Sequence, residues 1–132
     1  MANRVKTQAF TNINQILFNT DPQVSVSILA ANTGLSADSE GKKILKAGTP
    51  MAGSIEARGT AFVKATTTTA DGVSTSNAVG ILLHDVDVTA GNENATLLIF
   101  GFVDLNKVDT TTAALIDTAT KAALKGGVTF LK

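Results

Sequence analysis

The fold prediction depends most on the stretch AVGILLHDVDVTAGNENATLLIFGFVDLNKV, which runs from Ala78 to Val108. Two strand-like segments, Ile81–Val88 and Ala95–Val103, flank Thr89–Asn94, which contains a glycine and two asparagines. This arrangement is typical of a β-hairpin whose loop is longer than two residues. The second segment is almost continuously apolar, which indicates a strand covered on both faces. Gly101 within it predicts a bulge or a close approach of another backbone segment.

Outward from this hairpin, most of the chain has the pattern of short strands separated by turns. The expected turns are Ala47–Pro50, and Asp71–Gly72 within a polar loop at Thr66–Asn77. The expected strands are Val24–Leu29, Ile44–Leu45, Ser54–Arg58, Thr60–Lys64 and a terminal strand in Val128–Lys132.

One helix is predicted near the C-terminus, beginning at Asp109 and extending to about Lys125. Aspartate and threonine are favourable N-cap residues, and the apolar residues that follow approximate one stripe at the helical period. Gly126–Gly127 supplies the expected C-cap. The prediction is therefore a mainly β, α+β protein with one C-terminal helix, arranged as a small β-sandwich or barrel-like domain.

The first 23 residues differ in composition from the rest and are predicted to form an N-terminal arm on a single domain at 24–132. Apolar residues stand among Asn, Gln and Thr, which allows either a short amphipathic helix or an extended segment. Asp21–Pro22 is expected to end either structure. An arm of this kind binds a partner surface or packs on its own domain, and both alternatives stay open. The candidate partner-binding residues are Arg4, Lys6, Phe10, Ile13, Ile16 and Phe18.

Length and composition limit the function classes. The 132 residues fit one domain that can bury a core without staples, and no cysteine is present to form disulfides or thiolate sites. Lys and Arg number 11, as do Asp and Glu, so the balance does not favour binding to nucleic acid. No apolar run is long enough to span a bilayer, and the first residues do not have the pattern of a secretory signal.

The one histidine lies in His84–Asp85–Val86–Asp87, which raises the question of a metal or acid–base site. The stretch from Asp85 faintly resembles a calcium loop, but Ala90 and Thr96 stand where glycine and a bidentate glutamate are required. In a strand, His84 and Asp85 project to opposite faces and cannot pair directly. A solvated strand face is therefore the favoured interpretation, and we expect no metal, no cofactor and no catalytic residue.

Other chemical motifs are absent from the sequence. GLSADSEGKK, which begins at Gly34, has six residues between its glycines instead of four and lacks the Ser or Thr of a phosphate-binding loop. No serine stands in a G-x-S-x-G elbow, and phenylalanine is the only aromatic residue type. A non-enzymatic, interaction-based role without a small-molecule substrate is the leading prediction.

Several segments, in order, resemble the head decoration proteins of tailed phages, of the lambda type and its relatives. These segments are ILKAGTPMAGS, a polar loop containing ADG, AVGILLHDVDV, a short Gly/Asn turn, ATLLIFGFVD and AALKGGVTFLK. The resemblance covers about Ile44 to Lys132, whereas Met1–Gly41 has no confident counterpart. Each segment alone is weakly specific, and their order carries the resemblance.

The resemblance implies a capsid-stabilising (cement) protein on the outer surface of a bacteriophage head, made in the host cytoplasm. It implies a homotrimer seated on the major capsid protein, which an N-terminal arm contacts by adding a strand. It implies no enzyme activity and no binding to nucleic acid or membrane. The alternative is a head fibre or surface adhesin that binds host or environmental glycans, for which the Thr-rich loop is weak support.

Overall fold

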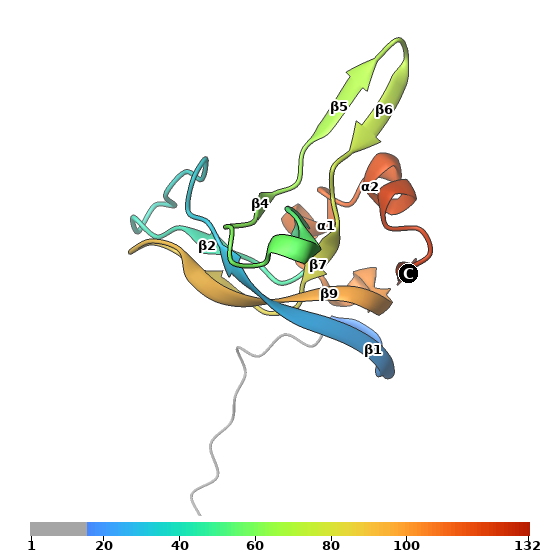
Figure 1. The fold of residues 1–132 in the computed structure, drawn as a ribbon, viewed down its shortest axis with the longest axis horizontal. Helices are drawn as coiled ribbons and strands as arrows, with labels where there is room; N and C mark the ends of the chain where they lie inside the picture. Colours follow the sequence, from blue (N-terminus) through green and yellow to red (C-terminus); the bar gives the residue numbers. More distant parts are fainter. Residues whose placement is uncertain (1–15) are drawn as a thin grey trace, which may run out of the picture.

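The computed structural model of the chain describes residues 16–132, so Arg4, Lys6, Phe10 and Ile13 lie outside the described residues (Figure 1). As predicted, the protein is mainly β with short helical segments near its C-terminus. The strands are β1 (Leu17–Ala30), β2 (Ile44–Leu45), β3 (Pro50–Ala52), β4 (Val63–Lys64), β5 (Thr67–Ala70), β6 (Val73–Ser76), β7 (Gly80–Leu82), β8 (Val86–Asp87), β9 (Glu93–Asp104) and β10 (Val128–Leu131). The helices are the 3-10 turns η1 (Ile55–Ala57) and η2 (Leu105–Lys107), α1 (Thr110–Ala113) and α2 (Thr118–Ala123).

The main sheet closes on itself to form a small barrel. Its strand order is β1-β9-β7-β3-β4, every neighbouring pair being antiparallel, and β10 adds to β9 in parallel. Phe62, just before β4, returns to β1: its N–H donates to the Leu29 carbonyl at 2.7 Å, and its carbonyl accepts from the Ala31 N–H at 2.8 Å. These bonds complete the ring of strands. Only full closure removes sheet edges, and here closure covers the end of β1.

Strands β7 and β9 form a wall between two apolar clusters. Leu82 and Leu97 pack inside the barrel with Phe62, whereas Leu98 packs on the other side against a cluster that includes residues of the C-terminal helices. The centre of β9 is therefore covered on both faces, as its continuous apolarity predicts. Further along, Phe100 is 41% exposed, so the coverage does not extend over the whole strand.

A large bulge in β1 faces Gly101. The register passes from Asn19 opposite Phe102 to Val24 opposite Phe100, so four residues of β1 stand against one glycine. Gly101 has a φ of 156°, and its N–H donates to the Gly127 carbonyl at 3.2 Å. The predicted bulge or close approach at this glycine is confirmed. The prediction that Asp21–Pro22 ends the N-terminal structure is wrong, because the strand continues on both sides of it.

The predicted C-terminal helix is present as two short helices. Asp109 and Asp117 are the N-caps of α1 and α2, accepting bonds from the Thr112 and Thr120 N–H groups at 3.4 and 2.8 Å. The second cap begins a new helix where continuous helix was expected. The predicted C-cap at Gly126–Gly127 is wrong, because α2 ends at Ala123 with Leu124 as its C-cap. Gly126, with a φ of 94°, lies in the turn that follows.

Three other segments differ from the strand predictions. The expected loop at 66–77 is largely the hairpin β5–β6, whose turn residues Asp71 and Gly72 have φ values of 52° and 77°, as a type I′ turn requires. The expected strand at Ser54–Arg58 is instead η1. The expected strand Ile81–Val88 is divided: β7 pairs with β9, whereas β8 turns away to pair with β2. No helix within residues 16–132 is long and apolar enough to cross a membrane.

Candidate functional site

The side chains around the histidine support the local fold. His84, Asp85 and Asp87 are all exposed. Asp85 accepts a 2.7 Å hydrogen bond from the Ala47 N–H, which holds the turn before β3 against this segment. Asp87 accepts bonds from the hydroxyl and the N–H of Thr89, and these bonds hold the pKa of Asp87 below its ordinary value. Both carboxylates thus have structural partners of their own.

No group of three or more acidic, histidine or cysteine side chains within residues 16–132 is arranged to hold a metal ion. Two further acidic groups with a lowered pKa also have a local cause. Backbone N–H groups of Lys42 and Glu40 bind Asp38, and the Thr120 N–H binds Asp117, so each carboxylate is stabilised in its charged form. Of the described titratable groups, these two and Asp87 are shifted by turn and cap hydrogen bonds instead of by burial in a reactive pocket.

The two described members of the predicted partner-binding set lie in opposite environments. Ile16 is fully buried in the apolar cluster beneath the helices, so its side chain is not exposed to a partner in this structure. Phe18, two residues later, is 58% exposed. Ile16 precedes β1, whereas Phe18 lies within β1 and projects to the face opposite the buried Leu17.

Exposed apolar side chains gather along β1 and the part of β9 that pairs with it. Val24, 49% exposed, stands directly opposite Phe100 in the register, and Phe18 stands near Phe102 and Val103. We call Phe18, Val24 and Phe100 the β1 patch. Large side chains left in water along one strand pair are typical of a surface that binds another molecule.

The start of β1 is fixed to the body at the point where residues 1–15 join it. The Ile16 carbonyl accepts a 2.8 Å bond from the Asp104 N–H, and the Leu17 carbonyl accepts a 3.1 Å bond from the Lys107 ammonium. The junction therefore holds one position relative to the β1 patch. Residues 1–15 therefore join the body next to Phe18.

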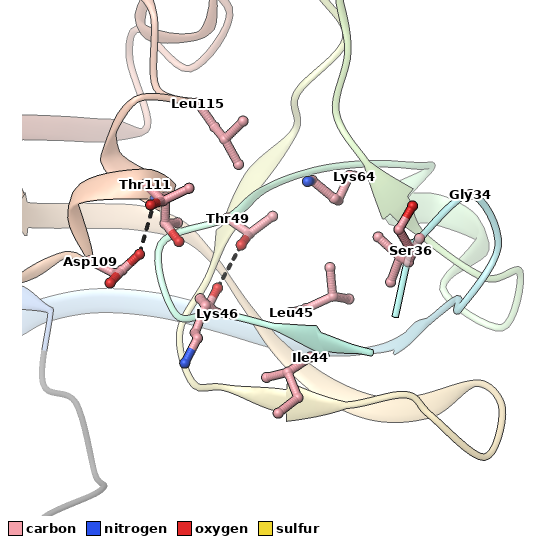
Figure 2. A pocket seen from close by; sticks show the side chains of 12 residues that line it. Gly34, Ser36, Ile44, Leu45, Lys46, Thr49, Lys64, Asp109, Thr111 and Leu115 are labelled. Carbon is pink, nitrogen blue, oxygen red and sulfur yellow. Dashed lines mark hydrogen bonds between the residues drawn. The ribbon is translucent and has the colours of Figure 1, made fainter. Parts of the chain in front are cut away.

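A second candidate surface is an open pocket of about 540 Å³ between β2, β4 and the α1 region (Figure 2). Leu45 and Thr49 point into it from one side, and Lys64 and Leu115 point into it from the other. Leu45 and Thr49 are buried, whereas Leu115 remains 39% exposed. The Thr49 hydroxyl donates to the Lys46 carbonyl at 2.7 Å, which shapes the turn that bounds the pocket.

A third feature is the hairpin β5–β6, which extends away from the barrel beside α2 (Figure 1). Its base is attached by the Thr67 hydroxyl, which donates to Asp117 at 3.0 Å, and by a 3.4 Å bond from the Thr120 hydroxyl to Ser76. Near the turn, Val73 is 64% exposed. The hairpin therefore presents a polar surface of Thr and Ser in which Val73 is the one large apolar side chain.

No protein-family model matches the chain, and no curated protein matches it.

Sequence reasoning missed most members of both surfaces. Phe100 lies in a continuous apolar run, and such a run does not indicate which of its residues is exposed. Lys64 and Leu115 are far apart in sequence and meet only because β4 and the α1 region border the same hollow. Val24 and Phe100 were both predicted to lie in strands. Nothing in the sequence indicates that these two strands pair, so it could not show that the two side chains stand opposite each other.

Proposed function

We propose that this chain is a structural capsid decoration protein, which binds the outer surface of a bacteriophage head and stabilises the shell. The observation that carries the proposal is the β1 patch, an exposed apolar surface adjoining the junction with residues 1–15. The order of sequence segments shared with decoration proteins adds support. In this role the protein transforms no substrate.

The physical basis is the burial of the β1 patch against the major capsid protein. Removing apolar surface from water stabilises a contact by about 25 cal/mol per Å², and Phe18 and Phe100 are the largest side chains in the patch. In this proposal residues 1–15 make additional contacts with the capsid protein through Phe10 and Ile13, either as an added strand or in another conformation. Many copies on one shell multiply a modest contact into substantial stabilisation of the particle.

Attachment as a homotrimer is part of the same proposal. In this proposal the contacts between copies are made by side chains on defined surfaces of the body. Low charge supports such contacts, because only 17% of residues are charged and fewer charges must be desolvated.

The test is co-sedimentation of the purified protein with heads of the phage that encodes it, assembled without the protein. We expect saturable binding by the full chain, and weaker binding after removal of residues 1–15 or after Phe18→Ala. Phe130→Ala, a substitution of a partly buried phenylalanine outside the β1 patch, is the matched control. Equal binding by all folded variants would contradict the role of the patch, and no binding by the full chain would contradict the function.

A further inference from the structure

The pocket between β2, β4 and the α1 region contains two lysines, Lys46 and Lys64, that form no ion pair with residues 16–132. Lys64 points into the hollow and Lys46 lies at its rim (Figure 2). Within the described part of the chain the one ion pair is between Lys42 and Glu40, so neither pocket lysine has an acidic partner there. Asp109, also in the lining, caps α1 and keeps its negative charge, so the two lysines leave the lining with one net positive charge. The pocket therefore favours an anionic group.

The same pocket is apolar around its lysines and borders strand β2. Ile44 and Leu115 are 37% and 39% exposed, and Leu45 forms part of the buried floor. Strand β2 pairs with β8 alone among the described strands, so its other edge has no strand partner among them. An extended segment laid along β2 would gain main-chain hydrogen bonds and bury these side chains.

From these observations we infer that the pocket receives an extended acidic segment of the shell protein, with a carboxylate on Lys64 and apolar residues on Ile44 and Leu115. This inference rests on the proposed function for the identity of the partner. It adds a second attachment point to the one at the β1 patch. The two surfaces involve different elements, so each can be altered separately.

Charge selects this occupant over the chain's own N-terminal segment. Residues 1–15 contain Arg4 and Lys6 and no aspartate or glutamate. Placing such a segment from the same or a second copy beside Lys64 and Lys46 would bring like charges together. An acidic segment instead pairs with the lysines, and pairs partly shielded from water are stronger than pairs on an open surface.

The experiment compares charge variants for binding to heads assembled without the protein, at several salt concentrations. We expect Lys64→Glu to weaken binding about tenfold or more, and Lys64→Gln to weaken it less while reducing its salt dependence. Lys132→Glu, the same change at an exposed site away from the pocket, should alter binding less than about twofold. The Tm of each variant is compared with that of the parent protein, so that a change in binding can be separated from a loss of folding.

A photo-crosslinking amino acid in place of Leu115 then identifies the occupant. We expect a crosslink to an acidic segment of the shell protein, and none from the same amino acid in place of Val73 on the hairpin. If the full chain binds heads but the Lys64 variants bind equally well, the inference is overturned and the proposed function stands. A crosslink from position 115 to residues 1–15 of another copy would also overturn it. If the full chain does not bind heads, both fail.

Discussion

Replacing Phe62 by alanine tests the barrel closure most severely. Phe62 is fully buried, and its N–H and carbonyl bonds to Leu29 and Ala31 join the last edge of the sheet to the first. Its ring also lies against Gly53, where an added Cβ would stand 2.5 Å from ring atom Cδ2. The side chain thus fills the core at the point where the segment before β4 meets the end of β1.

The expected cost follows from this burial. Truncating a buried phenylalanine to alanine destabilises by about 3–5 kcal/mol, because apolar contacts are lost and a cavity remains. A domain of this length has an unfolding entropy of about 0.28 kcal/mol/K, so each kcal/mol lowers Tm by about 3.6 °C. Phe62→Ala should therefore lower Tm by about 11–18 °C. The loss of about 3–5 kcal/mol is a large part of the free energy of unfolding of a typical domain.

Phe18→Ala is the matched control, because it makes the same chemical change at a side chain that is 58% exposed. We expect a cost below about 1 kcal/mol, since much of this ring is already in water. Circular dichroism during heating and denaturant titration measure both variants. Equal destabilisation by the two changes, or a Phe62→Ala protein that melts within about 3 °C of the parent, would refute the assignment of Phe62 to the closed core.

Two further predictions concern backbone approach and helix capping. Gly80→Ala should cost about 1–3 kcal/mol in denaturant titration, because the new Cβ would lie 2.8 Å from the Leu98 carbonyl oxygen; Gly59→Ala, with open space around it, should be nearly neutral. Asp117→Ala should cost about 1 kcal/mol by removing the α2 cap, and a helix measured as equally stable would contradict that role. Because the Thr120 N–H lowers the Asp117 pKa, this stabilisation is present above the ordinary value of 3.8 and is lost as pH falls below it, so the parent and variant should converge in acid.

The features predicted correctly from the sequence are those with local physical signals. Gly101 interrupts an apolar strand, and this position needs a backbone conformation and a close approach to Gly127 that suit glycine. Asp109 marks the start of the helical region, because an oxygen that accepts a free backbone N–H is a requirement of the helix end itself.

The division of the predicted helix had a signal that periodicity concealed. Asp109-Thr110-Thr111-Thr112 and Asp117-Thr118-Ala119-Thr120 share the pattern D-T-x-T, and in each the aspartate accepts from the N–H three residues on. The apolar stripe continues through the second pattern, which favours one helix. The structure instead buries Ile116 at the break and begins a new helix at the second cap.

The remaining differences arise from tertiary contacts that sequence patterns do not encode. The threonine-rich segment lacks apolar alternation, yet its hairpin is attached to the body by a hydrogen bond from the Thr67 hydroxyl to Asp117. The candidate surfaces have the same origin. Phe100 is exposed within an otherwise covered apolar run, and Lys64 lies beside pocket residues that are distant from it in sequence.

Electron microscopy of phage heads assembled with and without this protein tests the proposed function most directly. The account predicts added density on the outer surface of the shell at repeated lattice positions, with the β1 patch turned toward the major capsid protein. The density should disappear from heads made without the protein and return when purified protein is added. Heads that look the same in both preparations would contradict the account.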